Sequence, residues 1–245
     1  MRAFALMIII ALFGMSTAHA QLQKQKKWKV GLNRFSSGVN YKYEANFKEN
    51  VSDTAYTKIS KTSAGNIANT EFMLEYIFFG LMGLEVNFNL TPGVRNFSFN
   101  TTNEKIGDIV EEVKSGALYG VNFYFSDHTS PGFKFFAGIL TGSFLVTHTF
   151  SNGGDRPATL TTDQEALLAD NFKAAQTSTI TVPVQILKGG MDWIREAVGF
   201  RFQVSAIQAS ETKTSSGLGK TSLAQKQTET VSLSGGATLG IFGHF

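Results

Sequence analysis

The end of the chain, residues 231–245, alternates between two kinds of side chain. Odd-numbered positions from Val231 to Phe245 are apolar or glycine, whereas most even-numbered positions are small or polar. A period of two residues predicts a β-strand whose two faces have different surroundings. The same rhythm recurs along the chain in segments of roughly ten residues. The sequence therefore predicts an all-β protein.

The alternation predicts eight strands. The first changes phase across Ser36–Gly38, which predicts one long bulged strand, with two separate strands as the alternative. Pro92 interrupts the third strand, and Pro183 predicts an irregular sixth strand because proline cannot donate to a ladder. The strands are expected near residues 28–47, 71–78, 84–99, 119–125, 133–148, 179–186, 198–204 and 231–245.

Short and long connections alternate between these strands. Short turns are expected at 80–83, 126–132 and 188–192, and long connections at 48–69, 100–115, 149–177 and 205–230. Helices are possible within two of the long ones, over 162–176 after a capping-box pattern and over 106–113. All short turns and both chain ends then lie on one side, as in transmembrane β-barrels with short periplasmic turns and long extracellular loops.

The composition favours a membrane barrel over a soluble one. The mean hydropathy is −0.03 and there are 22 phenylalanines, yet after residue 20 no apolar run is long enough for a spanning helix. A secreted sandwich or calycin-like barrel would explain the alternation, but not the terminal Phe245 or the aromatic residues at strand ends. We therefore expect a closed antiparallel transmembrane barrel of eight strands, or ten, with its apolar side chains facing lipid.

Polar side chains of the alternating segments are expected inside the barrel, where eight strands leave just enough room for side chains. A buried carboxylate needs a cationic partner, and Arg201 is the obvious one for Glu75 and Glu85. Catalytic carboxylates are the alternative. The expected interior polar network consists of Glu71, Glu75, Glu85, Asn87, Asn122, Arg201 and Gln203, with Asn89 on the same face.

The first twenty residues read as a secretory signal peptide. Arg2 precedes an apolar stretch, and Ala18-His19-Ala20 is a small-x-small cleavage site, which leaves residues 21–245 as one barrel domain. The chain has no cysteine, and its net charge of +3 gives no reason to expect a nucleic-acid partner. The lysines of the segment 24–29 are expected in solvent, with a contact to anionic lipid as the alternative.

The tail also carries a family resemblance. Thr238, Gly240 and Phe245 match the C-terminal β-signal of bacterial outer-membrane proteins, although Gly243 stands where that signal has a bulky hydrophobe. The chain from residue 21 onward resembles small outer-membrane barrels of the outer-membrane protein A, X and W types, and residues 179–204 are similar to a hairpin of porin-like barrel domains. The resemblance implies a Gram-negative outer membrane, contact with lipid and lipopolysaccharide, and recognition by the barrel-assembly machinery.

The sequence contains little that indicates chemistry. His148 followed by Ser151 is faintly similar to the pair of eight-stranded lipid A deacylases, but residues three apart do not share a strand face. No metal-ligand spacing or phosphate loop is present, so we expect no catalytic residues, metal or cofactor. The expected role is a non-enzymatic barrel whose long polar loops serve a structural, adhesive or surface-interaction function, possible surface ligands included. A narrow pore for small or apolar solutes is the alternative, and a lipid A hydrolase is a weaker one.

Overall fold

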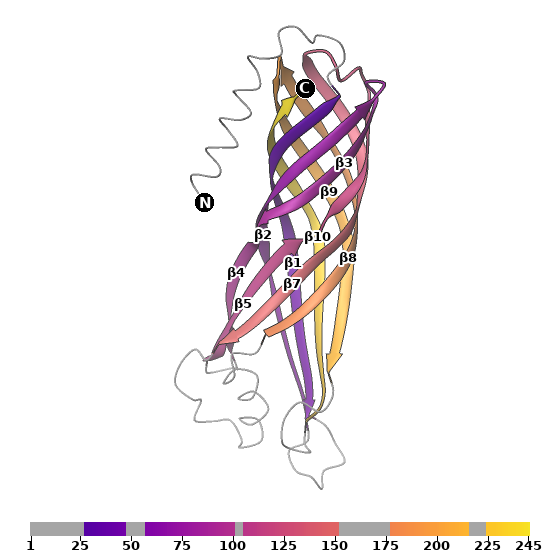
Figure 1. Ribbon diagram of the computed structural model, residues 1–245. Helices are drawn as coiled ribbons and strands as arrows, with labels where there is room; N and C mark the ends of the chain where they lie inside the picture. Colours follow the sequence, from indigo (N-terminus) through magenta and orange to yellow (C-terminus); the bar gives the residue numbers. More distant parts are fainter. Residues whose placement is uncertain (1–26, 48–56, 101–104, 152–176, 216–223) are drawn as a thin grey trace.

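The computed structural model describes residues 27–47, 57–100, 105–151, 177–215 and 224–245. These residues form antiparallel strands and short turns (Figure 1). No helix among them is both long enough and apolar enough to cross a membrane. The strands are β1 (Trp28–Phe47), β2 (Thr57–Phe78), β3 (Met82–Thr91), β4 (Gly93–Asn100), β5 (Lys105–Ser115), β6 (Leu118–Tyr124), β7 (Gly132–Ser151), β8 (Thr177–Arg195), β9 (Val198–Ser215) and β10 (Ala224–His244).

Eight of the strands close into a ring. The order is β1-β2-β3-β6-β7-β8-β9-β10, and β10 pairs with β1 to complete it. The chain ends meet there, because the Trp28 amide donates to the Phe245 carbonyl and the Phe245 amide donates to the Trp28 carbonyl. The short turns lie at the same end, which is the top of Figure 1. The expected closed antiparallel barrel of eight strands is confirmed.

The strands β4 and β5 extend the ring rather than widen it. β4 follows β3 after Pro92, and β6 follows β5 after the break at Gly116-Ala117, so each pair acts as one long interrupted strand. β4 pairs only with β5, and β5 also pairs with the far part of β7. The ten segments therefore make an eight-stranded wall, and the expectation of a loop or helix over 100–115 was wrong because a strand occupies 105–115.

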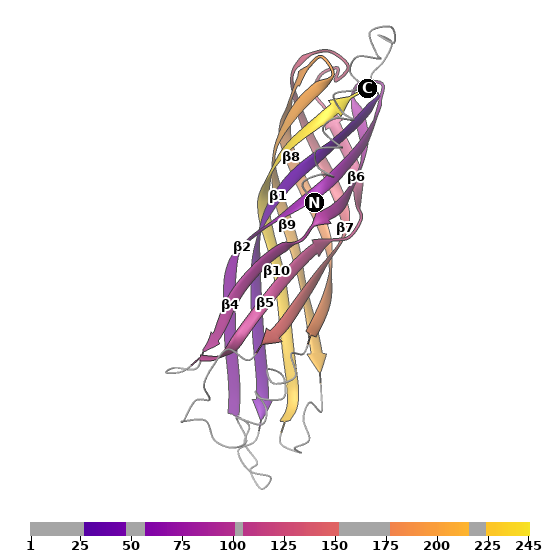
Figure 2. The same ribbon diagram turned by 60° about the vertical axis from the view of Figure 1, so that its left-hand side comes forward.

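Beyond the closed ring the wall divides into two four-stranded sheets. In the described residues, β2 from 57 to 69 has no ladder to β4, and the ladder between β8 and β9 stops at the pair Gln185–Gln208. One sheet is then β2-β1-β10-β9 and the other is β4-β5-β7-β8. Their ends separate at the bottom of Figure 1, and Figure 2 shows the same division from another side. We call the two lines without ladder bonds the β2–β4 seam and the β8–β9 seam.

The position of Pro183 follows from this division. β8 is continuous across it, so the expected irregular strand was wrong. Pro183 pairs with Ser143 of β7, and its other side faces the β8–β9 seam, where no ladder bond requires an amide hydrogen.

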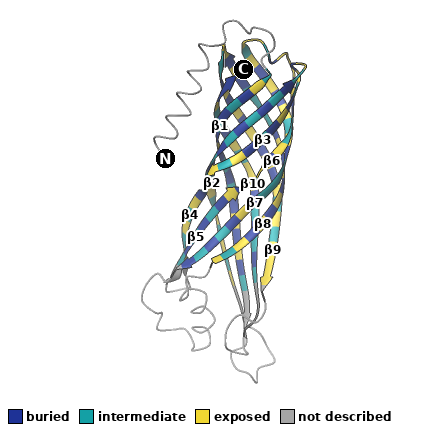
Figure 3. Cartoon of the chain, in the orientation of Figure 1, coloured by how far each residue is buried: buried dark blue, intermediate teal, exposed yellow. Residues whose placement is uncertain are grey.

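The character of the inward and outward faces is reversed between the ring and the two sheets. In the ring the inward side chains are mostly polar, and in the two sheets they are mostly apolar. In the ring, β1 turns Lys29 and Asn33 inward and the apolar residues Val30 and Leu32 outward. Farther along the same strand the inward residues are Phe35, Val39, Tyr41 and Tyr43, and the outward ones are polar. Every long strand shows this exchange, and the regular alternation of buried and exposed positions is visible in Figure 3.

This exchange corrects the expectation that all apolar faces meet lipid. The run Ile180, Val182, Val184 and Ile186 points inward and is buried, while its polar neighbours face out. The apparent phase change in the first strand has the same origin, because β1 keeps one register with β2 from end to end. The bulge lies on β10 instead, where Gly235 is the extra residue between two register blocks.

Other boundaries also differ from expectation. β2, β9 and β10 reach well into the segments 48–69 and 205–230, which were expected to be loops. β8 runs through 188–192, where a turn was expected, and the turn lies at Glu196-Ala197 instead. The helix expected over 162–176 and the signal peptide over 1–20 lie outside the described residues.

Candidate functional site

The interior of the closed ring holds a buried network of ion pairs. Three cationic and three anionic side chains meet there, and none is more than slightly exposed. The cations are Lys29, Lys188 and Arg201, and the anions are Glu75, Glu85 and Asp192. Equal numbers of opposite charges in mutual contact are what an interior without solvent requires. We call these six side chains the ring plug.

Arg201 is the centre of the ring plug. Its Nε lies 2.8 Å from Asp192 Oδ1, and its two terminal nitrogens lie 2.7 Å from Glu85 Oε2 and 2.9 Å from Glu75 Oε2. The planar guanidinium also lies over the Phe136 ring, 4.6 Å from its centroid. One guanidinium thus joins β2, β3 and β8, which suits the fixed fork of donors that arginine provides.

The two lysines complete the network on either side. Lys29 Nζ lies 2.6 Å from Asp192 Oδ2 and 3.1 Å from Glu75 Oε2, and Lys188 Nζ lies 2.7 Å from Glu85 Oε2. Asn122 donates to Glu75 and Glu85, at 2.7 and 2.6 Å, and the Tyr124 hydroxyl donates to Glu75. Each carboxylate therefore receives several charge-assisted hydrogen bonds.

The turn between β6 and β7 closes the ring at its short-turn end, next to the ring plug. His128 in this turn is fully buried, with Nε2 3.1 Å from Asp192 Oδ2 and its ring against those of Tyr124 and His244. Burial lowers the pKa of His128 to about 4, because desolvation of the imidazolium outweighs the attraction of Asp192. The expectation that His128 and His244 are solvated was therefore wrong.

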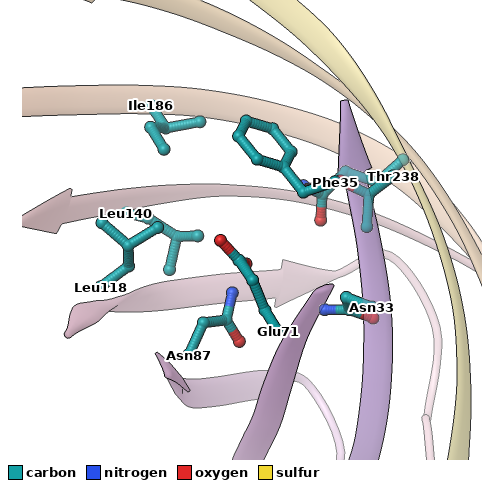
Figure 4. A pocket seen from close by; sticks show the side chains of 9 residues that line it. Asn33, Phe35, Glu71, Asn87, Leu118, Leu140, Ile186 and Thr238 are labelled. Carbon is teal, nitrogen blue, oxygen red and sulfur yellow. Dashed lines mark hydrogen bonds between the residues drawn. The ribbon is translucent and has the colours of Figure 1, made fainter. Parts of the chain in front are cut away.

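A small cavity separates the ring plug from the apolar interior beyond it. Its volume is about 10 Å³, which is room for about one water molecule. Figure 4 shows the Glu71 carboxylate pointing into it, with Asn33 and Asn87 on one side. The apolar side of the cavity is formed by Phe35, Leu118, Leu140 and Ile186, and Gln203 and Thr238 complete the lining.

Between the two sheets the interior is an apolar core. It contains buried side chains from both sheets, such as Phe35 and Phe144, whose rings lie 6.1 Å apart. Because these side chains contact one another across the space, the core is filled by packing rather than left as a channel. The buried members on β1, β2, β9 and β10 are Phe35, Val39, Tyr41, Tyr43, Ile67, Ile207, Val231 and Leu233, and β5–β8 provide the others.

A cluster of polar side chains interrupts this core beside the β2–β4 seam. Arg95 of β4 makes a 2.8 Å ion pair with Glu111, and Glu111 contacts Nε2 of the buried His148 at 3.0 Å. Arg95 also donates to the Val39 carbonyl on β1, at 3.4 Å, and its side chain lies against Gly65 of β2. Arg95 therefore reaches across the β2–β4 seam, where backbone pairing is missing.

The structure places all the side chains of the expected interior network inside the wall. It brings Glu75, Glu85, Asn122 and Arg201 into direct contact, whereas Glu71 and Gln203 line the small cavity. Asn87 reaches both groups, because it donates to Glu85 at 3.0 Å and lines the cavity. Thr238 is buried in the same region, which does not bear on its expected part in an assembly signal.

Three members of the ring plug were missed from the sequence. Lys29 was assigned to solvent with its neighbouring lysines, although its alternation with Trp28 and Val30 already indicated an inward side chain. Lys188 and Asp192 were assigned to a turn, because two glycines between them suggested a chain reversal. No cluster of three or more His, Cys, Asp or Glu suited to a metal is present in the described part of the chain.

Comparisons with known proteins agree with the architecture. No family model and no curated protein sequence matches the chain significantly. Among solved structures, the chain is similar to the outer membrane protein OprG from Pseudomonas aeruginosa, with a TM-score of 0.56 and 15% identity over 92% of this chain and 99% of that one. Two looser likenesses are Ail of Yersinia pestis, solved with a heparin analogue (TM-score 0.35, 10% identity, 85% and 98% covered), and Neisserial surface protein A (TM-score 0.38, 7% identity, 86% and 97% covered).

The OprG likeness spans nearly the whole of both chains. At this level of identity it establishes the fold alone. The chain therefore has the fold of the small outer-membrane β-barrels.

Proposed function

We propose that the chain is an integral barrel of a Gram-negative outer membrane with a non-enzymatic, surface-interaction role. The observation that carries this proposal is the exchange of side-chain environments along the strands. Most exposed large apolar residues lie on the closed ring, such as Phe200, Phe202 and Val204 on β9, and in the two sheets the described residues of this kind are Val94 and Leu145. Beyond them β9 presents Gln208, Ser210 and further polar residues to the outside.

The lengths of the strands support a projecting part. A tilted strand needs about 9–11 residues to cross the hydrocarbon. β1 and β10 have 20 and 21 residues, and their outward apolar side chains lie near the chain ends, over residues 28–32 of β1 and 237–241 of β10. The two sheets, with a polar outside and an apolar core, are thus built like a soluble domain standing on the membrane. The strand ends that the longer connections join lie at this projecting end.

The ring plug supports a role other than an open aqueous channel. Six buried charged side chains and the turn with His128 fill the ring at its short-turn end. The same proposal includes three further roles. Thr238, Gly240 and Phe245 act in assembly, the barrel contacts lipopolysaccharide, and residues 1–20 direct export.

Cysteine labelling tests the projecting part, since the chain has no native cysteine. We expect Asn40→Cys, on the outward face of β1, to react with a membrane-impermeant maleimide when the protein is in vesicles. Leu239→Cys, on the outward face of the ring, should react only after the vesicles are dissolved, because lipid covers it. Equal protection of both cysteines in folded, inserted protein would contradict a projecting half.

A second candidate function is the passage of small apolar molecules, and the two seams favour it. The apolar core lies behind two lines of the wall that lack ladder bonds, so the sheets can separate without breaking backbone pairing. A molecule entering between them would then leave sideways where a seam meets the closed ring, next to the bilayer surface, instead of passing the charged ring plug.

A disulfide across the β2–β4 seam tests this candidate. A Cβ on Gly93 would lie 3.0 Å from the Cβ of Ile67 and 2.5 Å from Asn69 Oδ1. The pair Ile67→Cys and Gly93→Cys is therefore close enough for a bridge once the Asn69 side chain turns aside and the two strands move slightly apart. We expect the oxidised bridge to slow uptake of an apolar fluorescent dye several-fold, and reduction to restore it. The control bridge, Ser210→Cys with Ser232→Cys, joins strands that are already paired and whose hydroxyls lie 3.2 Å apart. Equal uptake by both oxidised proteins would remove this candidate.

A further inference from the structure

A groove lies at the short-turn end of the barrel, on the outside of the wall. Its volume is about 570 Å³, and it lies between the β2–β3 turn, the β6–β7 turn and the residue that precedes β1. It is lined by Lys27, Tyr76, Ile77, Phe78, Phe79, Gly80, Asp127 and Thr129. None of these residues belongs to the ring plug or to the apolar core.

Phe79 is held in the groove wall at a conformational cost. It has φ of 53°, in the left-handed region that bulky residues avoid, and Gly80 follows with φ of 71°. The two are the central residues of a tight turn in the three-residue connection 79–81, and the Leu81 amide closes this turn by donating to the Phe78 carbonyl. Such turns favour asparagine or glycine where Phe79 stands, yet its side chain is 95% exposed. A strained turn that presents an aromatic ring outward indicates an apolar contact at this site.

The groove also carries one charge of each sign. Lys27 provides an ammonium group, and Asp127 provides a carboxylate that lies against Gly80. Hydrogen bonds from the Thr129 amide and hydroxyl lower the pKa of Asp127, so it stays ionised near neutral pH. Asp127 is exposed, so it can accept further hydrogen bonds from a ligand.

The groove continues onto the lipid-facing side of the ring. Tyr76 and Phe78 point outward on β2 with ring centroids 4.6 Å apart, and Trp28 packs on Tyr76 at 4.7 Å. Exposed aromatic side chains at a strand end mark the boundary between hydrocarbon and head groups. An apolar surface thus leads directly from the bilayer to the pair of opposite charges.

We propose that this groove binds one phospholipid with a phosphoethanolamine head group. Lys27 contacts its phosphate, Asp127 accepts hydrogen bonds from its primary ammonium, and an acyl chain lies along Tyr76, Phe78 and Phe79. The inference rests on the proposed membrane location of the barrel. It assigns the groove to a lipid of the leaflet on the short-turn side.

Trp28 reports on the groove because its ring contacts Tyr76. In Trp193→Phe protein it is the sole tryptophan, since the chain has two. The protein is placed in phosphatidylcholine vesicles that contain a small fraction of one lipid brominated close to its ester. We expect brominated phosphatidylethanolamine to quench Trp28 with an apparent affinity about threefold above that of brominated phosphatidylcholine, the scale of one exposed ion pair. Brominated phosphatidylglycerol should fall below phosphatidylethanolamine, because it lacks the ammonium.

Charge-removing variants test which side chain produces the preference for phosphatidylethanolamine. Asp127→Asn keeps an acceptor for Thr129 and should bring quenching by brominated phosphatidylethanolamine down to that by brominated phosphatidylcholine. Lys27→Met keeps the stem of the side chain and should weaken quenching by all three lipids, because each of them carries the phosphate that Lys27 contacts. The matched controls are Asp108→Asn and Lys42→Met, in the two sheets, and they should keep the preference. Migration as a folded barrel on an unheated gel verifies each variant.

The outcomes separate this site from the proposed location. Equal quenching of the parent protein by all three lipids, or strongest quenching by phosphatidylglycerol, overturns the phosphoethanolamine site and leaves the membrane barrel intact. Retention of the preference in Asp127→Asn also overturns it. A folded protein whose Trp28 is quenched by none of the lipids contradicts the membrane location itself.

Discussion

Replacing Arg201 by methionine is expected to destabilise the barrel by ~3–5 kcal/mol, or to prevent folding. The side chain is 1% exposed and contacts Glu75, Glu85 and Asp192. Without it, the three carboxylates face only Lys29 and Lys188, so the ring plug carries an uncompensated negative charge away from water. The free energy of unfolding in urea, measured for protein refolded into vesicles, gives the size of the effect.

Two further variants separate charge from packing. Arg34→Met removes an exposed guanidinium that donates to Thr70 at 2.9 Å, and it should change the unfolding free energy by less than about 0.5 kcal/mol. Adding Glu85→Gln to Arg201→Met restores the balance of charges and should recover part of the loss. If Arg201→Met unfolds with the same free energy as Arg34→Met, the ring plug does not stabilise the barrel.

Replacing Val182 by aspartate is expected to be as damaging in the projecting half. Val182 is fully buried and lies opposite Phe144 in the β7–β8 ladder. A carboxylate there has only the apolar core around it, and burial of an unpaired charge costs several kcal/mol. Separation of the two sheets should expose new protease sites, so limited proteolysis detects the effect alongside urea unfolding.

The adjacent residue provides the control for this prediction. Thr181 occupies the same strand but points outward and is exposed, so Thr181→Asp should shift the unfolding free energy by no more than about 0.5 kcal/mol. Both variants place an aspartate in the same strand, so strand propensity affects them alike. A difference in their unfolding free energies therefore reports which face of β8 points inward. An equal loss in both variants would contradict the inward apolar face.

The sequence alone was sufficient for the fold class. Alternation with a period of two, a terminal aromatic residue and regularly spaced turns predicted a closed antiparallel barrel, and the eight-stranded ring confirms it. The segment 57–69 was nevertheless expected to be a loop. Its residues are small or polar on both faces, with Thr62 and Ala64 on one and Lys61 and Ser63 on the other, so no alternation distinguishes a strand there. Its ladder with β1 is a long-range contact that local pattern cannot reveal.

The interior polar network could likewise be predicted from the sequence only in part. Arg201 and the carboxylates Glu75 and Glu85 stand in strongly alternating segments, so their side of the strand could be inferred. Asp192 and Lys188 could not be paired with them, because their neighbours Gly189 and Gly190 suggested a turn. Only closure of the wall brings β8 beside β7 and β9, and thereby brings Asp192 to Arg201.

The sequence by itself determined that the chain forms strands with two unlike faces and that these strands close into a barrel. The tertiary structure decided which face points inward. A period of two is unchanged when the two faces are exchanged, so alternation cannot distinguish apolar side chains that meet lipid from apolar side chains that meet one another. In this chain apolar side chains take both orientations along single strands, with Leu32 facing outward and Val39 facing inward on β1. That difference exists only once the strands enclose an interior.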